Sequence, residues 1–412
     1  MAAVAINLNF HFHFHDTLMK SLSIKKNHAL GAALFAAAMA LPFSNAVYAE
    51  AAPEKGIVAF KYINYEDSQP DKERMDINAY TVSAMAPIAG KWSISTSYTY
   101  DSVTGASPHR HSYFEPPEPD ATTGASKIRE QRYSGDLSVT RYLSKGSVTA
   151  GTSYSEENDY ISRGYSAQAS ISTEDKNTTF TFGGSYTTDT IAANIGEWRD
   201  SGRTEAKRTL AGLVGVTQVL TKQDIVQVNL GYSKGRGYFD DPYKEYEQRP
   251  DRRESKTVMT RWNHHFDGID GTSHLSYRYY TDSFGIKAHT FGLEYLQSLP
   301  NDWTVTPSVR FSSQTAADFY LPVDLTDPTM APAAAESLFW DGSYLSLDQR
   351  LSAYGALTLG IKVSKRIAKE WLVDVKYENY EQRAGWSMTG GGDPGLAPFS
   401  ASFYQIGFSR QF

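Results

Sequence analysis

The sequence predicts an all-β fold, a transmembrane antiparallel up-and-down β-barrel of about 16 strands. Segments in which apolar and polar residues alternate recur from Ile57 to the end of the chain. The connections between them alternate between short turns and longer loops, and the last segment ends on the aromatic Phe412. The composition agrees with this fold. The chain holds 27 Tyr and 20 Phe at a mean hydropathy of -0.44, because only every second residue of a barrel strand faces lipid.

The composition also limits the function. The 412 residues include no Cys, which excludes disulfide bonds and thiolate catalysis. A net charge of -6 gives no support for nucleic-acid binding. We therefore expect neither a cysteine-based enzyme nor a protein that binds nucleic acid.

The first part of the chain has the features of a secretory leader. Met19 offers a start for translation, and Lys25 and Lys26 follow as a positively charged region. The apolar run over residues 29–41 has the length of a signal-peptide core rather than of a membrane-spanning helix. Residues with small or medium-sized side chains follow, and they predict cleavage after Ala49.

The sequence therefore predicts two parts, a leader over residues 1–49 and a mature barrel over residues 50–412. Phe and His alternate over residues 10–15 and resemble a short metal-binding tract. Because these residues precede Met19 and are removed with the leader, we expect them to have no role in the mature protein.

Each predicted strand has one aromatic or aliphatic face and one polar face. Trp92, Ile94 and Tyr98 share one face, while the residues between them are Ser and Thr. This period of two is typical of a strand that separates two environments. The same pattern recurs over residues 132–139, 180–186, 226–232, 275–279, 351–363 and 371–377.

The predicted turns and loops alternate along the chain. Short turns are expected near residues 89–90, 144–145, 174–176, 221–223, 267–270, 300–301 and 368–369. The other connections, most of them longer, are expected near residues 67–73, 102–127, 156–159, 189–203, 237–253, 281–284, 315–346 and 382–398. Short periplasmic turns and longer external loops are typical of exported barrels, and this count gives an even number of strands. Pro307 is the one local objection, because a proline within a strand removes a ladder donor.

The last predicted strand places Tyr404, Ile406, Phe408 and Phe412 on one face. This pattern resembles the C-terminal signature by which the barrel-assembly machinery recognises outer-membrane proteins. Arg410 departs from it, but a long cation near the interface can reach the lipid headgroups. The alternative, a soluble propeller or sandwich, would have to bury all these aromatic faces against a second sheet.

Several stretches of the chain resemble a family of uncharacterised Gram-negative outer-membrane β-barrels, a domain of unknown function. The resemblance covers nearly all of the mature chain, and it is carried by residues 172–179, 231–239, 260–266, 278–280, 348–353, 380–383 and 409–412. It implies a location in the outer membrane, in contact with its lipid and lipopolysaccharide. Members are often encoded beside a flavin-attaching enzyme and a thioredoxin-like protein, which implies a periplasmic redox partner. The resemblance implies no catalytic residues.

Charged residues are predicted on the inner face of the barrel and are the candidate pore-lining residues: Arg132, Asp136, Arg261, Arg278, Glu294, Arg310, Arg350, Asp374 and Lys376. Such charges can form a constriction that selects solutes. They can equally pair with one another as a structural network, and the sequence leaves both readings open.

The sequence predicts no metal site, no cofactor and no catalytic residue. His264 and His265 fall on opposite faces of one strand, and His109 and His111 lack a third ligand nearby. The acidic stretch over residues 240–247 has no regular calcium-loop spacing, so we expect it to be a solvated loop.

Two functions remain open. The first is a porin-like or selective channel for small hydrophilic solutes or ions. The second is a plugged barrel that acts as a scaffold or receptor for a periplasmic or surface partner, for example a redox protein. The loops over residues 102–127 and 315–346 distinguish them, because loops that fold inward narrow or close the pore.

Overall fold

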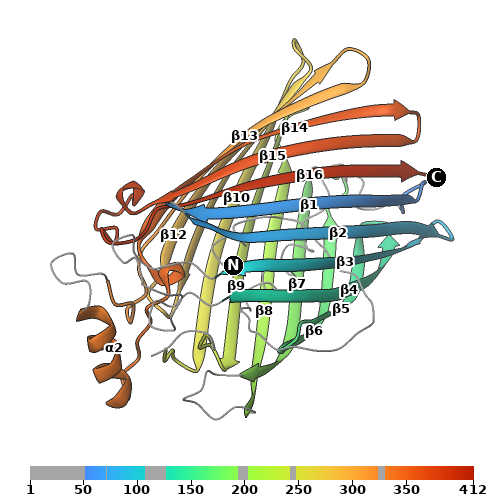
Figure 1. Ribbon diagram of the computed structural model, residues 1–412. Coiled ribbons are helices and arrows are strands. Elements are labelled where there is room, and N and C mark those ends of the chain that lie inside the picture. Colours follow the sequence, from blue (N-terminus) through green and yellow to red (C-terminus); the bar gives the residue numbers. More distant parts are fainter. Residues whose placement is uncertain (1–51, 71, 107–126, 194–202, 242–246, 323–329) are drawn as a thin grey trace.

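The computed structural model describes residues 52–70, 72–106, 127–193, 203–241, 247–322 and 330–412. Figure 1 shows one large sheet that closes on itself. The predicted leader over residues 1–49 and the cleavage after Ala49 lie outside the described residues, as do His109 and His111.

The fold is a closed antiparallel β-barrel of 16 strands, as the sequence predicts. Each strand pairs with its neighbours in sequence, and β1 pairs with β16 from Ile57 opposite Gln411 to Ser68 opposite Ser400. The strands are β1 (Ile57–Gln69), β2 (Lys72–Ile88), β3 (Trp92–Ala106), β4 (Lys127–Leu143), β5 (Gly146–Glu156), β6 (Tyr160–Ser172), β7 (Thr178–Ala193), β8 (Arg203–Val219), β9 (Asp224–Gly237), β10 (Arg252–Phe266), β11 (Gly271–Asp282), β12 (Lys287–Leu299), β13 (Trp303–Gln314), β14 (Tyr354–Ala368), β15 (Trp371–Arg383) and β16 (Phe399–Gln411). Closure gives the backbone groups of both edge strands a partner, which a sheet in lipid requires.

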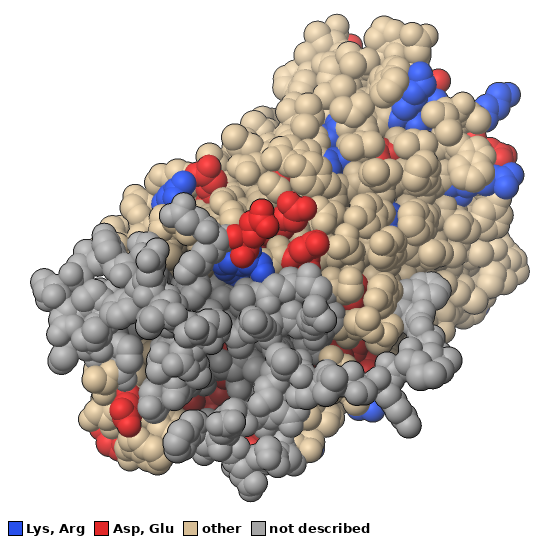
Figure 2. All heavy atoms as spheres, in the orientation of Figure 1, with Lys and Arg blue, Asp and Glu red and all other residues tan. Residues whose placement is uncertain are grey.

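The outer wall is apolar because the alternation of residues is in register around the barrel. In β1, Val58 and Phe60 are exposed on the outside, while Ile63 and Tyr65 are buried on the inside. Figure 2 shows the visible wall as a broad surface with few charged residues, and Lys, Arg, Asp and Glu gather mainly toward its ends. Large apolar side chains exposed around a closed barrel are the mark of a lipid-facing surface.

None of the helices in the described residues is long and apolar enough to cross a membrane. The longest described helix, α2 (Met330–Trp340), lies at the end of the barrel where the longer loops gather (Figure 1).

The barrel has two different ends. We call the end with the tight turns and the C-terminus the turn end, and the opposite end the loop end. Ala89 and Gly90 at the turn end have φ angles of 49° and 64°, and Asn301 and Asp302 both have 61°. Positive φ at both central residues is what a tight hairpin turn of the favoured twist needs. The strand ends place a short connection at or beside each turn expected from the sequence, so these turns are confirmed.

The connections at the loop end differ in length, as the expected ranges do. Three of its connections are short, over residues 70–71, 157–159 and 283–286. The other five connections are longer and span residues 107–126, 194–202, 238–251, 315–353 and 384–398.

Pro307 is accommodated within β13. Its pairing with Ile361 of β14 is intact, whereas the ladder to β12 is interrupted between Glu294 opposite Ser308 and Gln297 opposite Val305. The register is the same on both sides of the gap, so the missing N–H costs local pairing without shifting the strand.

The last strand has the predicted outward residues. Tyr404, Ile406 and Phe408 are exposed on the outer wall, and the backbone of Phe412 bonds to Gly56 at 3.0 Å. The guanidinium of Arg410 lies 5.5 Å from the ring of Trp371. This contact, near the turn end, explains how the outer face tolerates a cation.

Candidate functional site

Eight of the nine predicted pore-lining residues lie on the inner face of the barrel. The pairing registers place them beside buried inward residues, and their strand neighbours are exposed on the outside. The eight residues are Arg132, Asp136, Arg261, Arg278, Glu294, Arg310, Asp374 and Lys376.

Arg350 is the exception, and its prediction as a strand residue is wrong. The strand expected from Leu351 begins only at Tyr354, and Arg350 lies in a short 3-10 helix before it, η2 (Gln349–Leu351). The apolar alternation continues backward into this loop because its side chains pack inside the loop end rather than on the barrel wall.

One group of inward residues crosses four neighbouring strands. The registers place Arg261 of β10 opposite Ser276 of β11, which lies opposite Gly292 of β12, and Gly292 faces Arg310 of β13. Two arginines therefore flank two residues with small side chains. Beside them on the same wall, Glu294 lies 3.6 Å from the ring of His274.

The accessibility of Glu294 shows whether the interior of the barrel is filled. Glu294 lies near the middle of β12 on the inner face, yet half of its side-chain surface, 50%, is accessible. A solidly packed interior would leave no such surface. The barrel therefore encloses open space beside this carboxylate.

A second group of inward charges lies on β14, β15 and β16. The Nζ of Lys376 is 2.8 Å from Glu378, and Gln405 donates to Asp374 at 2.8 Å. Lys362 lies directly opposite Lys376 in the register. Lys61 of β1 lies close enough to this group to interact electrostatically with its charged side chains.

The other side of the barrel carries paired charges. Arg132 contacts Asp101 at 2.8 Å, and Asp136 accepts a hydrogen bond from Ser97 at 2.6 Å. Sequence reasoning named Arg132 and Asp136 but missed the partner Asp101. It also missed Lys61, although the alternation of Lys61 with the exposed Phe60 could have found it.

Long loops fold together at the loop end. Phe284, in the connection between β11 and β12, is 1% exposed, and its ring lies 5.9 Å from that of Phe239 and 5.0 Å from that of Phe319. Farther along, Tyr320 donates to Asp393 at 2.6 Å. Apolar packing and hydrogen bonds thus tie together loops that lie far apart in the sequence.

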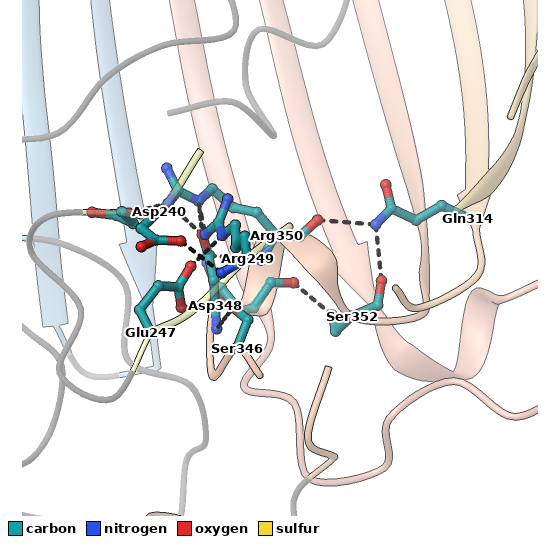
Figure 3. Close-up of polar contacts among 10 residues, drawn as sticks. Asp240, Glu247, Arg249, Gln314, Ser346, Asp348, Arg350 and Ser352 are labelled. Atoms are coloured by element: carbon teal, nitrogen blue, oxygen red, sulfur yellow. Dashed lines mark hydrogen bonds and ion pairs between the residues drawn. The ribbon is translucent and has the colours of Figure 1, made fainter. Parts of the chain in front are cut away.

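A buried charge cluster lies among the same loops, and we call it the loop cluster: Asp241, Glu247, Arg249, Asp348 and Arg350. Arg249 contacts Asp348 at 2.9 Å (Figure 3). Arg350 contacts both Asp241 and Asp348. Ser346 donates to Glu247 at 2.8 Å. Arg350 is therefore a structural cation of the loop end rather than a residue of the barrel wall.

The loop cluster contradicts the expectation of a solvated acidic loop. Asp241 and Glu247 are 6% and 1% exposed, because they meet Arg249 and Arg350 instead of water. Residues 242–246 of this stretch lie outside the described residues.

Burial sets the protonation of the loop cluster. Desolvation raises the pKa of Glu247 to about 7, and Arg249 opposes this shift. For Arg350, burial alone would lower the pKa, but Asp348 and Asp241 raise it above its ordinary value. The cluster thus keeps Arg350 charged, while Glu247 titrates near neutral pH.

Metal ligation finds no support in the described part of the chain. No group of three His, Cys, Asp or Glu side chains there could hold a metal ion. His264 faces outward to Asp224, while His265 faces inward to Thr272, as expected for adjacent strand positions.

Comparisons with known proteins come from solved structures and from families. The siderophore receptor PirA from Pseudomonas aeruginosa shares 10% identity at a TM-score of 0.44, with 86% of this chain and 62% of that chain covered. Pseudomonas aeruginosa OccK2 (OpdF) shares 10% identity at a TM-score of 0.42, with 88% and 98% covered. A bacterial polysaccharide outer membrane secretin shares 7% identity at a TM-score of 0.47, with 87% and 98% covered.

No curated protein matches the chain. A family model described as a protein of unknown function, DUF3570, matches residues 31–403. This match covers most of the barrel, in agreement with the family resemblance of the sequence. The chain belongs to this family of unknown function.

Proposed function

We propose that this protein is an outer-membrane channel through which small hydrophilic solutes or ions cross. The accessible side chain of Glu294 on the inner wall is the observation that carries the proposal. Barrels of about 16 strands are wide enough to enclose an aqueous channel. A polar inner wall, an apolar outer wall and space around a carboxylate at mid-height together describe a water-filled passage.

The proposal places the turn end in the periplasm and the loop end outside the cell. Tight turns and longer loops are distributed in this way in exported barrels. The apolar outer wall then contacts outer-membrane lipid, and the loops lie at the level of lipopolysaccharide. The last strand, ending in Phe412, would serve as the signal for the barrel-assembly machinery.

Conductance of the purified barrel in planar bilayers tests the channel. We expect discrete conductance steps as single barrels insert. Bilayers that stay silent, although the protein in them is folded by circular dichroism, would contradict a channel.

The packed loops give a second function a specific basis. The contacts among Phe239, Phe284 and Phe319 and the loop cluster favour a barrel that is narrowed or plugged at its loop end. Such a barrel would act as a scaffold or receptor, and the redox partner implied by the family resemblance is the candidate. Copurification of a flavoprotein or thioredoxin-like protein together with silent bilayers would favour this function. That the chain is no enzyme stays a prediction.

A further inference from the structure

The inner wall of the barrel is charged unequally. Between β10 and β1, on the side that includes β16, six cations face inward, leaving aside Arg366 at the turn end and the ion-paired Arg253 at the loop end: Lys61, Arg261, Arg278, Arg310, Lys362 and Lys376. Three carboxylates share this part of the wall, leaving aside Asp67 and Asp282, which are held in ion pairs at the loop end: Glu294, Asp374 and Glu378. We call these strands the basic wall, because cations exceed carboxylates there by three.

Most of the cations on the basic wall have no acidic partner. Glu378 forms an ion pair with Lys376 at 2.8 Å. Glu294 lies beside His274, and Asp374 accepts a hydrogen bond from Gln405. Four cations have no carboxylate within 4.0 Å among the described residues: Arg261, Arg278, Arg310 and Lys362. Cations on the inner wall normally pair with acids, so four without a carboxylate among the described residues favour binding of an anion from solution.

The opposite wall does not share this surplus. Arg132 is paired with Asp101, and Lys207 is paired with Asp189 at 3.1 Å. Asp136 has a serine hydroxyl as its partner and adds a negative charge. The attraction for anions is therefore confined to one side of the lumen.

The two arginines that flank Ser276 and Gly292 form the best-shaped part of the basic wall. Three strand spacings separate β10 from β13, about 14 Å at 4.8 Å each. The Nε atoms of Arg261 and Arg310 are both buried, and neither has a hydrogen-bond partner in the described part of the chain. Guanidinium groups bind carboxylates through paired N–H donors, and the small residues between them leave room for such a group.

The lysines lead to the same conclusion. Lys362 and Lys376 face each other directly across β14 and β15, and like charges in this position destabilise a sheet. Lys61 is a third cation close to them. An anion between these side chains would remove the repulsion.

We propose that the basic wall binds small organic anions, and that Arg261 and Arg310 hold the anionic group. This inference rests on the proposed channel and names the class of solute that it carries. The lumen then prefers anions to cations, although the whole chain has a net charge of -6.

Citrate binding to the detergent-solubilised barrel tests the basic wall independently of conductance. Equilibrium dialysis with labelled citrate should show binding to the wild-type protein, while labelled glucose should not bind. The double variant Arg261→Gln with Arg310→Gln should weaken citrate binding at least about tenfold, because two charge-assisted contacts are lost. Arg163→Gln is the matched control, because it makes the same Arg-to-Gln change on the outer face of β6, away from the lumen.

Reversal potentials in a KCl gradient supply the second readout. The wild-type channel should favour chloride over potassium, and the double variant should lose at least about half of that preference. Absence of citrate binding, or equal binding by the double variant, would overturn the inference whatever the bilayers show. Silent bilayers with intact citrate binding would overturn only the proposed channel. A conducting barrel that binds no citrate would support the proposed channel and contradict anion binding by the basic wall.

Discussion

Glu247 makes the loop end sensitive to pH. Its side chain is 1% exposed, and burial, reinforced by Asp348 and Asp241, raises its pKa from 4.5 to about 7. Between pH 4.5 and about pH 7, the Glu247 carboxyl is therefore protonated in the closed loops and ionised in the opened loops. The contribution of Glu247 to the stability of the closed loops is fully present below pH 4.5, and it is lost as the pH rises from 4.5 to about 7.

The size of the effect follows from the two pKa values. They differ by 2.5, and each pKa unit corresponds to about 1.36 kcal/mol, so the closed loops lose on the order of 3 kcal/mol between pH 4 and pH 8. Glu247→Gln mimics the protonated carboxyl and can still accept the hydrogen bond from Ser346. The variant should keep its closed loops at pH 8.

Hydrogen–deuterium exchange, corrected for the intrinsic effect of pH, measures this opening. Protection of residues 247–253 and 345–352 should fall about 200-fold in the wild-type protein from pH 4 to pH 8. It should stay nearly constant in Glu247→Gln. Glu174→Gln, an exposed change in the turn between β6 and β7, is the control and should behave as wild type. Equal protection of the wild-type loops at both pH values would refute the reasoning, as would an equal fall in Glu247→Gln.

Three further changes test the loops and the wall. Arg350→Ala leaves Asp241 buried without its cation and Asp348 with Arg249 alone, and should cost the loop end about 3–5 kcal/mol in exchange experiments; a loss under 1 kcal/mol would show that water replaces the cation. Phe284→Ala removes a fully buried ring, and should weaken the same loops by about 3–5 kcal/mol and raise channel conductance; unchanged conductance would show that these loops do not narrow the passage. Leu210→Arg places a charge on the outer wall near the middle of β8, and should destabilise the barrel in lipid by about 2–4 kcal/mol in unfolding titrations; a neutral result would argue against lipid at that position.

The sequence predicts the barrel well because one physical rule governs every strand. Lipid on one side and water on the other impose a period of two, and the period assigns Asp374 and Lys376 to the inner face without any knowledge of contacts. The same rule extends too far at Arg350, where alternation continues into a packed loop. Alternation shows which residues share a face, but it does not show where the ladder stops.

The loop cluster lies beyond sequence reasoning for a different reason. Arg249 and Asp348 are separated by 99 residues and meet only because two long loops fold over the same end of the barrel. That Arg261 has no carboxylate within 4.0 Å in the described part of the chain is hidden in a similar way, because it depends on how far along neighbouring strands each acid lies. Position along the lumen is set by strand stagger, which composition and period do not contain.

A single cysteine at Glu294 tests the water-filled lumen most directly. The chain has no native Cys, so Glu294→Cys creates a unique thiol on the inner wall, and Leu210→Cys provides a matched thiol on the outer wall. In barrels reconstituted in lipid, a charged, membrane-impermeant thiol reagent should modify Glu294→Cys and lower its conductance, and should leave Leu210→Cys unmodified. A thiol at position 294 that the reagent never reaches would contradict the account.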